Sequence, residues 1–238
     1  MKAIDASPKL TEQVYRAILD DICDGELPAG THLVQEQLAD RLGVSRQPVQ
    51  QAMALLKVDG IIEAVGKRGL RVTHLDLDLM RHRYEIRAVL DGLAARGAAA
   101  RAHDDAAFAA DLERRGRAIL AAGEAAVAAG ATLDQIGHDE AFHNLIYDAS
   151  GNPFLAATAQ PHWRFLRRVM SEVLRYAEPP QDIWRQHAEI LQAVTAGNPA
   201  LAEARALEHI GRAADGLDRH LGRNADADAA ANARETGR

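Results

Sequence analysis

The first third of the chain carries apolar residues at helical spacing in three short segments. In the first segment Val14, Ile18 and Ile22 recur about one turn apart, which is typical of a helix with one buried face. Thr11 precedes this stripe as the expected N-cap. Glycine and proline separate the segments, so each one predicts a helix of its own. The three predicted helices cover residues 10–27, 35–42 and 45–59.

The pattern then changes from the helical period to that of short strands. Residues 61–65 and 70–72 are rich in β-branched and aliphatic side chains, and a turn bounded by Gly66 and Gly69 joins them, which predicts a β-hairpin. From about Asp76 onward only helical patterns remain, with strong breakers between them. Six further helices are predicted, over residues 79–102, 105–129, 132–149, 153–177, 182–196 and 199–222.

These elements predict a mainly α protein with two domains. Two short helices joined by a glycine turn and followed by a hairpin match a winged helix-turn-helix, which we expect within residues 1–75. The six later helices predict an all-α antiparallel bundle over residues 76–222. Residues 223–238 have no large apolar side chains to bury, and we therefore expect a disordered tail there.

Composition agrees with a helical fold and limits the class of protein. Hydrophobic residues make up 47% of the chain but aromatic residues only 4%, a balance that favours closely packed, alanine-rich helices. Cys23 is the single cysteine, which excludes a disulfide within the chain and a site with several thiolates. No apolar run has the length of a signal peptide core or a membrane span, so we expect a cytoplasmic protein with no membrane partner.

The net charge is −6, yet basic residues gather in the predicted third helix and the hairpin. Residues 41–71 hold six basic residues against two acidic ones, a local charge of +4. A helix in the major groove would offer three side chains to base edges, and the hairpin would offer two to phosphates. These are Arg46, Gln47 and Gln50, and Lys67 and Arg68, respectively. The same charges could instead form a solvated face on a protein-interaction module.

This region resembles the winged-helix domain of the GntR family of bacterial transcription regulators over about residues 10–73. The resemblance rests on LPAGT at residues 27–31, on LADRLGVSRQPV at residues 38–49 and on the glycine-bounded hairpin. It implies double-stranded operator DNA as partner, a homodimer, and Ser45 among the DNA-contacting residues. Where the family commonly has Arg-Glu-Ala-Leu, the chain has Gln-Gln-Ala-Met from Gln50 onward, so we expect an altered operator preference and a shallower salt dependence.

Four residues in the later helices have side chains suited to bind a metal. Asp139 and His143 lie four residues apart and therefore share one helix face. His187 and His209 stand in largely apolar neighbourhoods of two later helices. Three imidazoles and one carboxylate suit a divalent ion of borderline hardness, and Zn²⁺, Ni²⁺, Mn²⁺ and Fe²⁺ are all compatible. Judged from the residues alone, each histidine could instead be a hydrogen-bonded residue of the core.

The sequence around these residues resembles the FCD ligand-binding domain of the FadR subfamily, over about residues 78–221. All four positions at which that domain holds a divalent metal are filled, by Asp139, His143, His187 and His209. The resemblance thus implies a metal centre, for which Zn²⁺ is the first choice and Ni²⁺, Mn²⁺ or Fe²⁺ are alternatives. With four protein ligands, an octahedral ion keeps two positions open for a small carboxylate effector.

Arg87 looks like the arginine that meets the effector carboxylate in this family, and its planar fork suits that task. It could instead pair with Asp91 or Glu85. The combined resemblance predicts a ligand-responsive transcription regulator and not an enzyme. Two alternatives stay open at this point: a hydrolase whose metal activates water, and a regulator whose metal only holds helices together.

Overall fold

The computed structural model describes residues 8–66, 69–176 and 179–236, and the chain divides into two compact units. The first contains the described residues up to Leu75 together with Arg164–Arg168. The second contains Asp76–Trp163 and the described residues from Val169 onward. Within the described ranges there are nine helices and one small sheet, so the predicted mainly α class, with a wing after the helix-turn-helix, is confirmed.

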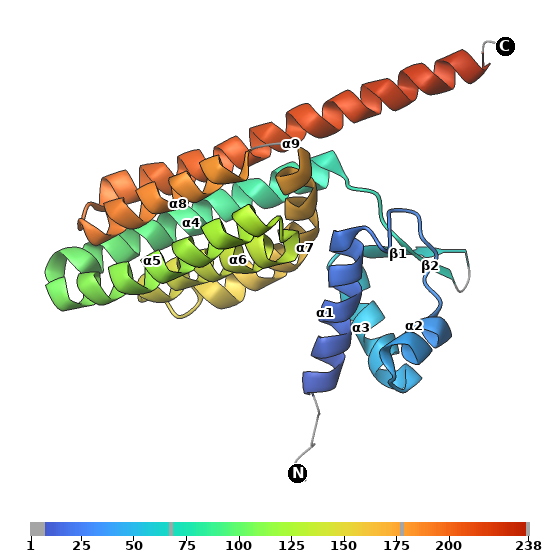
Figure 1. The fold of residues 1–238 in the computed structure, drawn as a ribbon, viewed down its shortest axis with the longest axis horizontal. Helices are drawn as coiled ribbons and strands as arrows, with labels where there is room; N and C mark the ends of the chain where they lie inside the picture. Colours follow the sequence, from blue (N-terminus) through green and yellow to red (C-terminus); the bar gives the residue numbers. More distant parts are fainter. Residues whose placement is uncertain (1–7, 67–68, 177–178, 237–238) are drawn as a thin grey trace, which may run out of the picture. The chain divides into compact units, whose positions relative to one another are not determined.

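Three helices form the core of the first unit: α1 (Pro8–Asp24), α2 (Gln35–Leu42) and α3 (Arg46–Val58) (Figure 1). Their apolar stripes face one another, and Ile18, Val49 and Leu56 have no exposed surface. Thr11 is not the N-cap that the pattern predicts. It lies inside α1, which begins at Pro8, and its hydroxyl donates to Gln51 Oε1 at 2.8 Å.

The wing follows α3 as an antiparallel hairpin of β1 (Ile62–Val65) and β2 (Gly69–Val72). The segment before α2 adds backbone hydrogen bonds along the other edge of β2. Gly30 N–H donates to the Val72 carbonyl at 2.9 Å, and Leu33 N–H donates to the Leu70 carbonyl at 2.8 Å. The hairpin is therefore anchored on both sides of β2, which fixes its position against the helices of this unit.

Six helices build the second unit, and Figure 1 shows several of them running side by side. The helix α6 has the bounds that the sequence predicts, and α9 continues to Thr236, through most of the segment for which no ordered structure is expected. This extension is rich in alanine, the residue with the highest intrinsic helix propensity. The helices are α4 (Leu77–Asp104), α5 (Ala106–Ala129), α6 (Thr132–Ala149), α7 (Leu155–Tyr176), α8 (Pro180–Thr195) and α9 (Pro199–Thr236).

Local capping explains where several helices begin and end. The Asp76 side chain accepts from Leu79 N–H at 3.0 Å at the start of α4, and Asp105 accepts from Phe108 N–H at 2.9 Å at the start of α5. Each carboxylate satisfies an amide that has no partner inside the helix. Gly43 ends α2 with a φ of 65°, in the left-handed region that glycine adopts without steric cost.

Small residues let the helices of the second unit approach closely. On α4, a row of alanines that includes Ala94, Ala95 and Ala98 is fully buried. On α5, a Cβ added at Gly123 would lie 2.1 Å from the Trp184 ring of α8. The alanine-rich, aromatic-poor composition thus allows the helix backbones to pack closely and still leaves room for the few large side chains between them.

Replacement of Gly123 by alanine is expected to destabilise the protein by about 1–3 kcal/mol, because the Trp184 ring must move out of its packed position. Gly211→Ala is the matched control on α9: a Cβ there meets nothing within 4 Å, and alanine should stabilise the helix by up to about 1 kcal/mol. Urea unfolding midpoints of the two variants measure the difference. Equal midpoints would contradict the close packing of α5 on α8.

Candidate functional site

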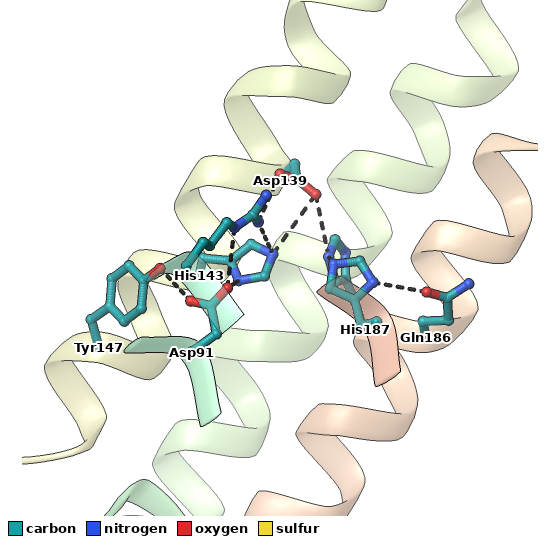
Figure 2. A network of polar contacts seen from close by, with 8 residues as sticks. Asp91, Asp139, His143, Tyr147, Gln186 and His187 are labelled. Atoms are coloured by element: carbon teal, nitrogen blue, oxygen red, sulfur yellow. Dashed lines mark hydrogen bonds and ion pairs between the residues drawn. The ribbon is translucent and has the colours of Figure 1, made fainter. Parts of the chain in front are cut away.

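The structure brings the four predicted metal-binding side chains together in the middle of the second unit. Asp139 and His143 come from α6, His187 from α8 and His209 from α9, and one ligand atom of each lies within 4.8 Å of all the others. Figure 2 shows Asp139, His143 and His187 turned toward one another. All four are buried, with 0–5% of their surface exposed. Side chains up to seventy positions apart therefore meet at one point.

The distances among these groups are those of a compact donor set. His187 Nε2 lies 3.2 Å from His209 Nε2 and 3.2 Å from Asp139 Oδ1. His143 Nε2 lies 4.0 Å from the same carboxylate oxygen. Neither oxygen of Asp139 accepts a hydrogen bond, although both are buried. Only the His187 ring and the more distant Arg87 face this carboxylate closely, and a bound cation would give it a direct partner.

Neighbouring side chains fix which nitrogen of two imidazoles faces the cluster. His209 Nδ1 lies 2.8 Å from Gln186 Oε1, which can only accept, so the ring proton is on Nδ1. His143 Nδ1 lies 3.5 Å from Asp91 Oδ2, and this carboxylate likewise favours a proton on Nδ1. The Nε2 atoms of both rings then carry lone pairs and face the cluster. Such outer partners commonly orient metal-binding histidines.

Three of the four candidate ligands have the protonation states that a metal requires. Burial lowers the pKa of His187, and burial together with the neighbouring His187 lowers the pKa of His209 well below its usual value. Burial alone would raise the pKa of Asp139, but contacts with His187, His143 and Arg87 outweigh it and hold that pKa below the usual range. Neutral imidazoles and an ionised carboxylate need no deprotonation before they bind a cation.

Arg87 of α4 is buried against this cluster and has several partners. Its Nε lies 3.1 Å from Asp91 Oδ2, its Nη2 lies 2.9 Å from His143 Nε2, and its guanidinium lies 4.2 Å from the centre of the Trp163 ring. The pairing with Asp91 that the sequence left open is therefore present. The arginine also lies beside the four candidate ligands, at 3.9 Å from Asp139 Oδ2.

Three further residues support the cluster: sequence reasoning named Asp91 only as a possible partner of Arg87, and it missed Tyr147 and Gln186. Asp91 contacts both Arg87 and His143, Tyr147 donates a hydrogen bond to Asp91, and Gln186 contacts His209. A signal existed for two of them, because Asp91 is four residues from Arg87 and Tyr147 is four residues from His143. As a set, three imidazole nitrogens and one carboxylate could hold a divalent metal of borderline hardness.

The predicted DNA-contacting residues lie on the exposed side of α3. Ser45 precedes this helix, and Ser45, Arg46, Gln47 and Gln50 are exposed while Val49 and its apolar neighbours face the core.

Arg46 forms an ion pair with Glu36 of α2, beside a surface hollow of about 550 Å³ between the start of α2 and strand β2. Lys67 and Arg68, predicted at the tip of the wing, lie outside the described residues. Among the described helices, none is both long and apolar enough to cross a membrane.

The chain is similar to several known regulators. The probable D-xylose utilization operon transcriptional repressor of Paenarthrobacter nicotinovorans is 28% identical over 204 residues, 84% of this chain and 85% of that one. The HTH-type transcriptional repressor RspR of Escherichia coli K12 is 24% identical over 207 residues, 87% of this chain and 88% of that one. The solved structure of E. coli McbR/YncC shares the fold, with a TM-score of 0.72 at 20% identity over 89% of this chain and 98% of that one.

Two families account for both units. Residues 10–72 match the bacterial regulatory proteins of the gntR family, and residues 82–212 match the FCD domain. The second match alone covers more than half of the chain. The chain therefore belongs to the GntR family of bacterial transcriptional regulators and carries an FCD domain after its winged helix.

Proposed function

We propose that this regulator responds to a small organic acid that binds at a divalent metal in the FCD domain, and that this binding changes its affinity for operator DNA. One observation carries the proposal: Asp139, His143, His187 and His209 place four donor atoms within 4.8 Å of one another in a buried position. The unsatisfied carboxylate of Asp139 supports a cation at that point.

The donor set indicates the chemistry of the ion and of its ligand. Three nitrogens and one oxygen favour Zn²⁺, with Ni²⁺, Mn²⁺ or Fe²⁺ as alternatives, over the harder Mg²⁺ and Ca²⁺. Four protein ligands leave an octahedral ion two positions, which a bidentate carboxylate can fill by displacing water. Arg87 would receive the same carboxylate through its guanidinium, which is only 2% exposed and is held beside the cluster.

The DNA-binding half of the proposal assigns base contacts to α3. Arg46, Gln47 and Gln50 are exposed on its first two turns, the part of a recognition helix that reaches base edges in the major groove. Lys67 and Arg68 would neutralise phosphates from the wing. In the free protein Arg46 pairs with Glu36, so a contact with DNA has to replace that ion pair.

A second copy of the chain is the expected partner, because a dimer reads two half-sites. The helix α4 has an exposed apolar stripe, made by Leu79, Ile86 and Leu93 at seven-residue spacing and by Val89, which is 67% exposed. A stripe with this period suits pairing with another helix. We assign it to the homodimer interface.

A dimer would also strengthen the response to the effector. A tenfold preference of the acid for one arrangement of the dimer supplies about 1.4 kcal/mol per site, and the two sites add.

The metal is tested by the response of the melting temperature to Zn²⁺. At a hundredfold excess over Kd, Zn²⁺ should raise the melting temperature of the chelator-treated protein by roughly 5–10 °C. Asp139→Asn should abolish this shift. Because the amide has the same shape and Arg87 keeps its ion pair with Asp91, the metal-free variant should remain folded, which circular dichroism checks.

His138→Gln is the matched control, since His138 lies on the same helix but outside the cluster, and the Zn²⁺ response of this variant should stay intact.

A screen of mono- and dicarboxylates completes the test. Acids that stabilise only the metal-loaded protein and that also change operator affinity support a receptor. If chelation lowers the melting temperature but leaves operator affinity and its response to every acid unchanged, the metal is merely structural.

Gln50→Arg is expected to shift operator preference toward guanine at the contacted position, or to steepen the salt dependence of binding by about one ion. Gln51→Arg adds the same charge one residue later, where the side chain accepts from Thr11, and should leave base preference unchanged. Binding to a randomised operator library at several salt concentrations distinguishes the two variants. Identical behaviour would refute the assignment of Gln50 to the DNA.

Val89→Asp is expected to weaken the dimer about 30-fold or more, because each dimer would then bury two unpaired carboxylates in an apolar interface. Phe154→Asp replaces another highly exposed apolar residue that is not part of the stripe, and it should leave the dimer intact. Light scattering during size-exclusion chromatography over a dilution series measures the molar mass, and hence the dimer dissociation, of both variants. An unaffected dimer in Val89→Asp would remove α4 from the interface.

A further inference from the structure

Arg87 donates a hydrogen bond to His143 Nε2, the nitrogen through which His143 would bind the proposed metal. Its Nη2 lies 2.9 Å from His143 Nε2. A guanidinium has only donors, so His143 Nε2 must be the acceptor and must carry its lone pair in this direction. That lone pair is also the one through which His143 would ligate a metal, and it can serve only one partner at a time.

We propose that Arg87 holds the metal-binding lone pair of His143 in the metal-free regulator, so that loading of the centre requires Arg87 to give this nitrogen up. The inference rests on the proposed metal centre. In addition to any contact with an effector, Arg87 would then compete with the metal for His143 Nε2. This competition keeps the metal affinity low until Arg87 Nη2 finds another acceptor.

The surroundings of Arg87 keep it within reach of His143. Asp91 Oδ2 lies 3.1 Å from its Nε, and the second oxygen of Asp91 accepts from the Tyr147 hydroxyl. The Trp163 ring lies under the guanidinium at 4.2 Å. These contacts anchor one edge of the fork through Nε and leave Nη2 as the part that can change its acceptor.

Because Arg87 is buried, displacing it from His143 Nε2 lowers the affinity of the centre for a metal. Arg87 is 2% exposed, so water does not readily replace the lost acceptor when His143 Nε2 is taken. A carboxylate bound nearby would supply a new acceptor to Nη2. Metal and acid should then strengthen each other's binding, and by linkage the factor must be the same in both directions.

The test measures Zn²⁺ affinity of the full-length protein by competition with a chromophoric chelator. Arg87→Lys keeps the positive charge, and a single ammonium nitrogen can pair with Asp91 but cannot span from there to His143, as the fork does. The variant should bind Zn²⁺ about tenfold more tightly than the wild type, because a hydrogen bond from a charged donor no longer has to be broken. Asp139→Asn, measured in the same assay, identifies the fraction of Zn²⁺ bound at this centre.

A charge-balanced double variant guards against a misfolded Arg87→Lys. Arg87→Met with Asp91→Asn removes both members of the buried ion pair, so the net charge near the metal is unchanged and Tyr147 keeps an acceptor. Compared with Asp91→Asn alone, which equally lacks the carboxylate beside His143 Nδ1, the double variant should bind Zn²⁺ about tenfold more tightly.

Circular dichroism of the metal-free variants checks their folding. Arg87→Met, measured alongside, removes the charge as well as the hydrogen bond. If it gains Zn²⁺ affinity while Arg87→Lys matches the wild type, simple charge repulsion explains the data and the inference fails. A wild type that binds no Zn²⁺ at Asp139 would refute the metal centre itself.

Discussion

The burial of two carboxylates in the FCD helices is the constraint on which the site depends. Asp91 and Asp139 are 3% and 2% exposed, and ionised groups at that depth need compensating charge. Arg87 pairs closely with Asp91, at 3.1 Å, but only at 3.9 Å with Asp139. One guanidinium is thus shared by two acids, and His187 and His209, whose pKa values are lowered, contribute lone pairs and no charge. A divalent cation at this point would compensate the negative charge that one guanidinium leaves.

Close helix packing is what allows such short side chains to meet. Aspartate and histidine reach only a few ångströms from their backbones, so the helices that carry them must approach one another closely. The helix α5 carries none of these side chains, but its Gly123 lets α8 pack closely by making room for the Trp184 ring. Trp184 in turn meets the His187 ring edge to face at 5.2 Å, and Phe142 stacks on the other side at 4.5 Å. The packing of α8 therefore also orients His187, its candidate ligand.

The sequence predicted most of the fold because its breakers are strong and its helical stripes are long. The bounds of α6 were predictable because Gly130 and the Ser-Gly-Asn-Pro segment from Ser150 enclose an uninterrupted pattern. The end of α9 was not, since a search for apolar stripes does not register a helix favoured by alanine propensity alone. Thr11 failed as a cap for a related reason: a capping residue type gives no signal when the helix begins earlier.

The candidate ligands were also predictable, whereas of the residues that support them only Asp91 was named, as a possible partner of Arg87. Asp139 and His143 share a helix face by spacing alone, but this spacing is common on any amphipathic helix. Asp91 and Tyr147 carry the same weak signal on two different helices. It becomes informative only when α4 and α6 are known to pack so that the Tyr147 hydroxyl reaches Asp91. Long-range packing of this kind is not encoded in the periodicity of either segment.

The two roles that the sequence left open for Arg87 are compatible once its atoms are considered separately. Nε serves Asp91 while Nη2 serves His143, so pairing within α4 anchors the residue without using the whole fork. A buried guanidinium needs an acceptor in every state of the centre. That requirement disfavours a state with metal alone, because His143 Nε2 is then taken and Nη2 is left without its partner. Under the proposed competition, the states with neither ligand and with both would be favoured instead, and the protein would detect an acid only together with its metal.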